Sequence, residues 1–179
     1  MAIMTKEELV SLLGSWENLF LLNKISPDPE EYLPLLMEIA LEGKDTSSWR
    51  AVWVADKIME QHPEALLPWR ETIIGILSRI RHGGKRRQLM RMLTRCEIPE
   101  SSAGMLFDYC QERLFLSEEK VAVKVYAMDI LYNISGQAPE LKQEVIQTLE
   151  QVAEQFQGAG IVARTRKIIV RLRKEIHQR

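Results

Sequence analysis

The sequence predicts an all-α fold in which helical hairpins follow one another along the chain. Apolar residues recur at the 3.6-residue spacing of amphipathic helices, as they do between Leu141 and Phe156. The dipeptide Pro-Glu also recurs, at spacings of 34, 36 and 40 residues. Proline fits the first helical position because the N–H there has no intrahelical partner, and a neighbouring glutamate faces the positive end of the helix dipole. The sequence therefore predicts four helix starts, at Pro29-Glu30, Pro63-Glu64, Pro99-Glu100 and Pro139-Glu140.

Length and composition agree with this fold class. The chain has 179 residues, of which 46% are hydrophobic and 27% are charged, so it can build a core and is not disordered throughout. The length fits one domain over residues 1–179. Two cysteines exclude a disulfide framework, and Cys96 and Cys110 are expected to be reduced core residues.

The first two hairpins are expected over residues 5–42 and 47–81. Thr5 and Glu8 have the spacing of a capping box, which predicts a first helix from Thr5 to about Leu22. Ser47 or Ser48 is expected to cap the first helix of the second hairpin. Each hairpin also contains an internal proline, Pro34 or Pro68, where we expect the helix to start late or to bend.

The next two hairpins are expected over residues 85–115 and 118–157. A helix is expected over residues 85–96, and Ser117 is expected to open another that ends near Gly136, a candidate left-handed cap. A capping helix over residues 160–177 should bury a stripe of apolar residues and expose a basic face. The expected stripe consists of Val162, Ile169, Leu172 and Ile176.

Tandem hairpins with a period near 36 residues resemble HEAT and armadillo α-solenoids over essentially the whole chain. The stretch from Ser48 to Pro68 looks like the HEAT-like domains of uncharacterised bacterial proteins, some of which are labelled adenylosuccinate lyase. That enzyme family has a much longer chain and a signature loop rich in glycine and serine, and this sequence has neither. The resemblance implies a helical-repeat scaffold for binding a protein or peptide.

Motifs that carry catalytic or cofactor chemistry are missing. The three histidines lie far from one another and from the cysteines, so no metal site is expected, and no cofactor is expected either. The segment from Gly158 to Ala163 matches the dinucleotide-binding fingerprint, but a helix precedes it where that motif needs a strand. An interhelical turn is therefore expected, with Gly158 as a C-cap and Gly160 at the start of the next helix. With neither a signal peptide nor an apolar membrane span in view, a cytoplasmic location is expected.

A cluster of basic side chains suggests a second function. Residues 1–60 contain five basic and eleven acidic residues, a net charge of −6, whereas no acid interrupts residues 79–95. Arg87, Arg91 and Arg95 are spaced to share one helical face, which favours binding of phosphate or nucleic acid. The alternative is a solvated face that pairs with acids such as Glu97, Glu100 and Glu112. The candidate anion-binding residues are Arg81, Lys85, Arg86, Arg87, Arg91 and Arg95.

Two tryptophans form a second candidate site. Trp49 and Trp53 are four residues apart on one helix, with Asp56 one turn further on. Stacked aromatic rings beside basic residues can hold a base, and some HEAT-like DNA glycosylases combine tryptophans and an aspartate on such a scaffold. The alternative is packing between helices.

These observations favour a non-enzymatic scaffold in which the second helices of the hairpins line a shallow concave surface for a protein or peptide. The alternatives are a nucleic-acid or phosphate-binding protein, in the manner of a repair glycosylase, and an enzyme of the lyase type. The sequence leaves the oligomeric state and the identity of the partner open.

Overall fold

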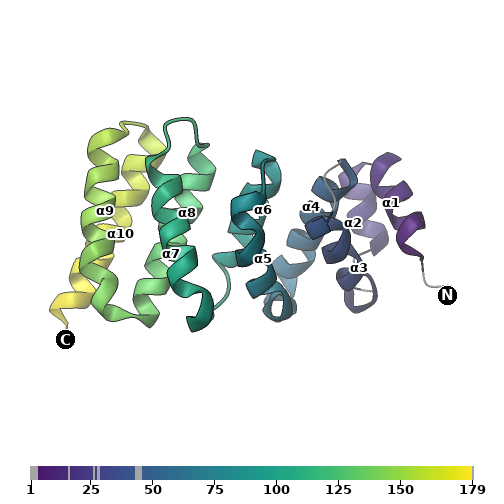
Figure 1. Ribbon diagram of the computed structural model, residues 1–179, viewed down its shortest axis with the longest axis horizontal. Helices are drawn as coiled ribbons and strands as arrows, with labels where there is room; N and C mark the ends of the chain where they lie inside the picture. Colours follow the sequence, from purple (N-terminus) through teal and green to yellow (C-terminus); the bar gives the residue numbers. More distant parts are fainter. Residues whose placement is uncertain (1–3, 16, 26, 28, 43–45, 179) are drawn as a thin grey trace. The chain divides into compact units, whose positions relative to one another are not determined.

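The computed structural model describes residues 4–15, 17–25, 27, 29–42 and 46–178. Over these residues the regular structure consists of ten α-helices and three short 3-10 helices, with no strand (Figure 1). The prediction of an all-α fold is therefore confirmed. Contacts divide the chain into two compact units, unit 1 (residues 1–92) and unit 2 (residues 93–179), and the expectation of a single domain stays a prediction.

Unit 1 is built around one central helix, α4 (Thr46–Gln61), which packs against α1, α2, α3 and η1. A helix that is apolar on most of its circumference belongs in a core. Accordingly, α4 buries Ala51, Val52, Val54, Ala55, Ile58 and Met59. The other elements of unit 1 are α1 (Lys6–Ser15), α2 (Asn18–Ile25), α3 (Pro29–Glu42), η1 (Pro63–Trp69), α5 (Arg70–Ile76), η2 (Leu77–Arg79) and α6 (Gly83–Leu93), whose last residue falls in unit 2.

The predicted capping box at the start of α1 is confirmed. The Glu8 backbone N–H donates to Thr5 Oγ1 at 3.2 Å, and the Thr5 N–H donates to Glu8 Oε2 at 2.8 Å. The predicted length of this helix is wrong, because α1 ends at Ser15 and α2 begins at Asn18. The Ser15 hydroxyl donates to the Ser11 carbonyl at 3.0 Å, a side-chain bond that competes with the helical backbone.

Ser47 and Ser48 lie inside α4, which begins at Thr46, so neither starts the helix as predicted. Both are buried. The Ser48 hydroxyl donates to the Ala40 carbonyl at 3.1 Å and accepts from Lys85 Nζ at 2.8 Å. Ser48 therefore joins α3, α4 and α6 instead of capping a helix.

All four Pro-Glu dipeptides lie at helix starts, as predicted. Pro29 opens α3, Pro63 opens η1, Pro99 is the N-cap of α7, and Pro139 opens η3. Pro68 lies in the 3-10 helix η1 and α5 begins only at Arg70, so the expected late start is found there. In contrast, α3 begins at Pro29 and continues through Pro34.

Unit 2 is organised around α8 (Val121–Gln137), which packs against α7, α9 and α10. It buries Val123, Ala127, Met128, Ile130, Leu131 and Ile134. The remaining elements are α7 (Glu100–Phe115), η3 (Pro139–Leu141), α9 (Lys142–Gln155) and α10 (Ala159–His177). Cys110 is fully buried in α7, as predicted, and burial raises the pKa of its thiol, whereas Cys96 is half-buried.

Three predicted features of unit 2 are wrong. α8 begins at Val121 rather than at Ser117, whose hydroxyl donates to Glu118 Oε2 at 2.9 Å. Gly136 lies inside α8, and no glycine among the described residues has a positive φ, so none is a left-handed cap. Gly158 lies in the turn between α9 and α10, as expected, but it is the N-cap of α10 with an extended backbone rather than a C-cap.

The buried face of α10 also differs from the predicted stripe, because it is rotated about the helix axis by about one residue. Ile161, Thr165, Ile168 and Leu172 are buried, at the spacing of one helical face. Ile169 is buried as well, whereas Val162 is 36% exposed and Ile176 is 38% exposed. The expected basic face is present, because Arg166, Lys167, Arg171, Arg173 and Lys174 are exposed. None of the helices in the described part of the chain is long and apolar enough to cross a membrane.

Candidate functional site

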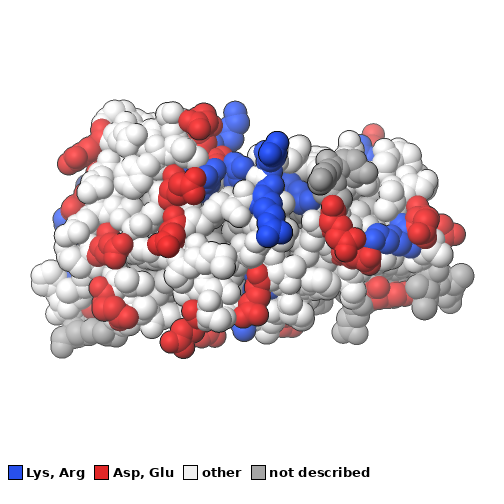
Figure 2. Space-filling model, in the orientation of Figure 1, with Lys and Arg blue, Asp and Glu red and all other residues white. Residues whose placement is uncertain are grey.

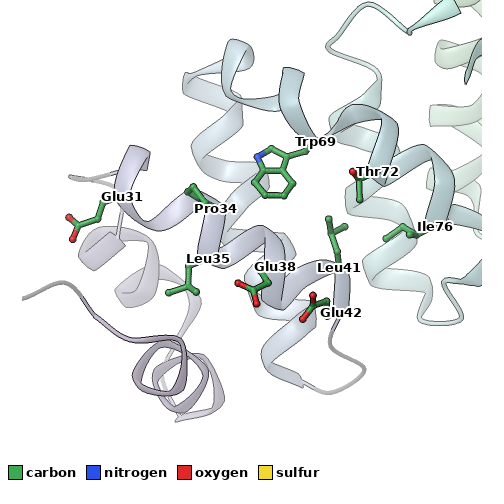
Figure 3. Close-up of a pocket in the computed structure, with 9 residues that line it drawn as sticks. All are labelled: Glu31, Pro34, Leu35, Glu38, Leu41, Glu42, Trp69, Thr72 and Ile76. Carbon is green, nitrogen blue, oxygen red and sulfur yellow. The ribbon is translucent and has the colours of Figure 1, made fainter. Parts of the chain in front are cut away.

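A groove of about 620 Å³ runs between α3 and α5 in unit 1 (Figure 3). Helices α3 and α5 are the second helices of the first two predicted hairpins. Nine residues line the groove: Glu31, Pro34, Leu35, Glu38, Leu41, Glu42, Trp69, Thr72 and Ile76. The groove therefore combines an apolar floor with three carboxylates.

One face of α3 supplies most of the lining. Glu31, Glu38 and Glu42 are 7 and 4 residues apart, so they follow one side of the helix. Leu35 and Leu41 alternate with them and are half-buried. Because α3 rises about 1.5 Å per residue, the carboxylates of Glu31 and Glu42 are spread over about 17 Å of helix.

Trp69 supplies the aromatic part of the opposite wall. It is the last residue of η1, directly before α5, and is half-buried. Figure 3 shows its indole directed toward Pro34 and α3. Thr72 and Ile76 extend this wall along α5, at the spacing of one helical face. A half-buried tryptophan beside an open groove offers a large apolar contact surface to a ligand.

The carboxylates on the rim already bind one cation from within the protein. Lys6 Nζ on α1 donates to Glu38 Oε1 at 2.5 Å and to Glu42 Oε2 at 3.3 Å. The hydrogen bonds to Glu38 and then Glu42 raise the pKa of Lys6 above its ordinary value. The rim of the groove therefore has the geometry to receive a primary ammonium group.

The predicted anion-binding cluster is divided by the structure. α6 ends at Leu93, so Arg95 lies beyond the helix and does not continue the face of Arg87 and Arg91. Lys85 is buried and bonds to Ser48, and Arg86 donates to the Ile80 carbonyl at 2.6 Å. Arg81 and Arg87 are exposed. Figure 2 shows basic side chains gathered in a strip over α6.

Arg91 belongs to an ion-pair network with α4. Its guanidinium pairs with Asp56 Oδ2, and its second amino group lies 2.5 Å from Glu60 Oε1. Asp56 is fully buried and also accepts a hydrogen bond of 2.7 Å from Gln88 Nε2. The alternative to anion binding was pairing with acids of neighbouring repeats, such as Glu97, Glu100 and Glu112. Arg91 pairs with two acids, Asp56 and Glu60, both of which lie on α4.

Trp49 and Trp53 are both half-buried on α4. The Trp49 ring lies 6.3 Å from the His82 ring at an interplanar angle of 59°, which is a tilted packing contact. Gly84 lies beneath the same indole, since a Cβ placed there would be 2.7 Å from Trp49 Nε1. Trp49 therefore packs between helices, which was the alternative to base binding.

The close contact between Gly84 and Trp49 can be tested by substitution. We expect Gly84→Ala to lower the free energy of unfolding by about 1–3 kcal/mol, because the new methyl group displaces the indole. Gly83→Ala is the matched control, since nothing lies within 4 Å of a Cβ at that position in the same helical turn. Urea unfolding of the two variants, followed by tryptophan fluorescence, measures the difference. Equal midpoints would contradict the close contact.

A smaller cavity of about 320 Å³ lies in unit 2 beside Cys96. Its polar residues hold the backbone that precedes α7: Gln137 exchanges hydrogen bonds of 3.2 and 2.8 Å with Ile98, and Asn133 donates to the Thr94 carbonyl at 3.0 Å. These side chains serve the fold. Among the described residues, no group of three or more His, Cys, Asp or Glu side chains is arranged to hold a metal ion.

Comparison with known proteins identifies the family. A family model described as a HEAT repeat domain matches residues 6–172. The chain belongs to the HEAT repeat family. The match agrees with the resemblance to HEAT and armadillo solenoids. Together with the helical structure, it supports the α-solenoid fold class. No curated protein and no solved structure matches the chain.

Sequence reasoning missed the groove as a site, although the relevant signals are present. The repeated pattern Pro-Glu-x-x-Leu-Pro contains Pro34 and lies directly before Trp69 in its second copy. The acids of α3 contribute to the negative charge of residues 1–60. Their convergence with Trp69 depends on the packing of η1 and α5 beside α3, which a linear pattern does not show.

Proposed function

We propose that this HEAT repeat protein is a non-enzymatic scaffold that binds a protein or peptide segment in the groove between α3 and α5. The observation that carries the proposal is the groove itself, where half-buried Leu35, Leu41 and Trp69 remain open to a ligand. Helical repeats offer extended surfaces of this kind, and grooves between helices accept amphipathic segments. A cytoplasmic location is part of the proposal.

The alternative of nucleic-acid or phosphate binding receives less support. Lys85, Arg86 and Arg91 are already bonded within unit 1. Arg81 and Arg87 are the exposed members of the cluster, and two guanidinium groups provide only a small share of the phosphate contacts that a nucleic-acid site uses. A glycosylase-like base site is similarly disfavoured, because Trp49 packs on His82 and Gly84.

A peptide titration tests the proposal. The probe is a fluorescent amphipathic peptide of about 14 residues, long enough to span about 20 Å as a helix. We expect Trp69→Ala to weaken its binding at least about tenfold, since aromatic anchors dominate such interfaces. Met105→Ala is the matched control, because Met105 is a 60% exposed apolar residue on α7. Equal loss in both variants, or no binding to the wild-type protein by fluorescence anisotropy, would overturn the proposal.

A further inference from the structure

We infer that the occupant of the α3–α5 groove is a cationic amphipathic helix of a protein partner, and that Lys6 competes with it for the carboxylates of the rim. The inference rests on the proposed function and specifies the chemistry of the partner.

The charge of the groove favours a cationic partner. The groove presents Glu31, Glu38 and Glu42 along one side, and none of the described residues that line it is basic. The side chain of Glu38 is 45% exposed and that of Glu42 is 68% exposed, so both can be reached by a partner. An acidic or phosphorylated segment would be repelled there, whereas lysine or arginine would find a carboxylate partner.

The apolar floor of the groove favours an amphipathic helix. Lysine and arginine have long aliphatic stems that lie along apolar surface while the charged end reaches water or an acid. Leu35, Leu41 and Ile76 can receive the apolar face of a partner helix, and the Trp69 indole can also attract a cation. Glu31 and Glu38 are 7 residues apart on α3, or about 10 Å, which equals two turns of a partner helix. We therefore expect basic residues at positions i and i+7 of the partner.

Lys6 already binds two of the carboxylates on the rim. Its ammonium group bonds Glu38 and Glu42 at 2.5 and 3.3 Å, and so occupies the contacts that an incoming lysine would make. The Lys6 side chain is itself 37% exposed. Exposed ion pairs are worth about 0.2–1 kcal/mol each, so a partner with several cations can displace Lys6. Lys6 thus reduces the affinity of the groove for weakly cationic segments.

Three versions of one peptide test the inference on the full chain. They share leucines at helical spacing and carry lysine, glutamine or glutamate at the same remaining positions. We expect the lysine peptide to bind about tenfold more tightly than the glutamine peptide and the glutamate peptide to bind most weakly, a preference that decreases as salt is added. The double variant Glu38→Gln and Glu42→Gln should remove most of this preference. Glu7→Gln, an exposed acid outside the lining, is the control.

The competition by Lys6 is tested separately, by the affinity of the lysine peptide for a Lys6 variant. Lys6→Met should tighten binding of the lysine peptide about two- to fivefold, because it removes two internal ion pairs without removing an acid. Lys120→Met, at an exposed lysine of unit 2, should leave binding unchanged. Equal or weaker binding by Lys6→Met would overturn the competition.

The outcomes separate the two proposals. If the glutamine peptide binds as tightly as the lysine peptide and Trp69→Ala weakens both, the cationic partner is wrong and the peptide-binding scaffold stands. If none of the three peptides binds the wild-type chain, both proposals fail. Circular dichroism of each variant confirms that it is folded before binding is measured.

Discussion

Replacing Asp56 with alanine is expected to lower the free energy of unfolding by about 3–5 kcal/mol, the largest loss among the variants considered. Asp56 is fully buried on α4 and receives Arg91 and Gln88 from α6. Removing the carboxylate leaves the half-buried Arg91 guanidinium without its buried counter-charge. It also removes the acceptor of the hydrogen bond that the buried Gln88 amide donates. The loss is large because both groups would have to give up water in the folded state without recovering these bonds.

Glu60 provides the matched control, because the same guanidinium of Arg91 also contacts it. The Glu60 side chain is 41% exposed, and Glu60→Gln should therefore cost less than about 1 kcal/mol. The double variant Asp56→Ala with Arg91→Met should recover part of the loss, since it removes both charges. Urea unfolding followed by circular dichroism measures all three. Similar losses for Asp56→Ala and Glu60→Gln would show that burial of Asp56 does not set the strength of the network.

The opposite result is expected for Lys124→Met, which should raise the free energy of unfolding by about 1–3 kcal/mol. Lys124 lies in the first turn of α8 and is only 1% exposed. Its Nζ lies 3.2 Å from the centroid of the Phe156 ring, and no hydrogen-bond acceptor among the described residues serves it. The contact with the ring offsets only part of the cost of removing an ammonium group from water. Methionine retains the apolar stem and removes the charge.

The dependence of stability on pH tests the same side chain. Desolvation lowers the pKa of Lys124 below its ordinary value, and Glu119 and Glu118 only partly oppose this. Between the lowered folded pKa and the unfolded value of 10.5, the unfolded chain binds more protons, so this group makes stability rise with pH. In Lys124→Met that contribution should be absent, and the gain from the substitution should shrink as pH rises through this window.

Lys120→Met is the control, because Lys120 is exposed one turn before Lys124. It should change stability by less than about 0.5 kcal/mol. Thermal unfolding of both variants across the alkaline range provides the comparison. A clear loss of stability in Lys124→Met would mean that the ammonium group is needed by Phe156 and Glu119.

Features that depend on a few neighbouring residues were predictable. The Thr5–Glu8 capping box and the four Pro-Glu helix starts rest on hydrogen bonds and dipole effects within one turn. The all-helical class follows in the same way from apolar spacing along each segment. Errors arose where local signals compete, as at Ser15, where a serine side chain bonds the helix backbone, and at Ser117, where the hydroxyl bonds Glu118 instead of capping a helix.

The candidate sites were less predictable because their residues are far apart in the sequence. Arg91 was predicted as an anion ligand from its spacing to Arg87, and nothing near it in the sequence points to Asp56, 35 residues away. The groove likewise depends on Trp69 reaching α3, and the charge of its rim depends on Lys6 reaching Glu38, 32 residues away.

The sequence by itself determined the helix starts at the Thr5–Glu8 capping box and at the four Pro-Glu dipeptides. It also determined that the chain is helical throughout its described regular structure and that it resembles HEAT repeats. Only the tertiary structure decided which charges are buried, which basic residues are already paired, and which apolar side chains remain open between α3 and α5. The physical reason is the distance along the sequence between the residues that interact. Helix starts depend on contacts within a turn, whereas burial and pairing depend on which distant helices pack together, and that is set by the whole core.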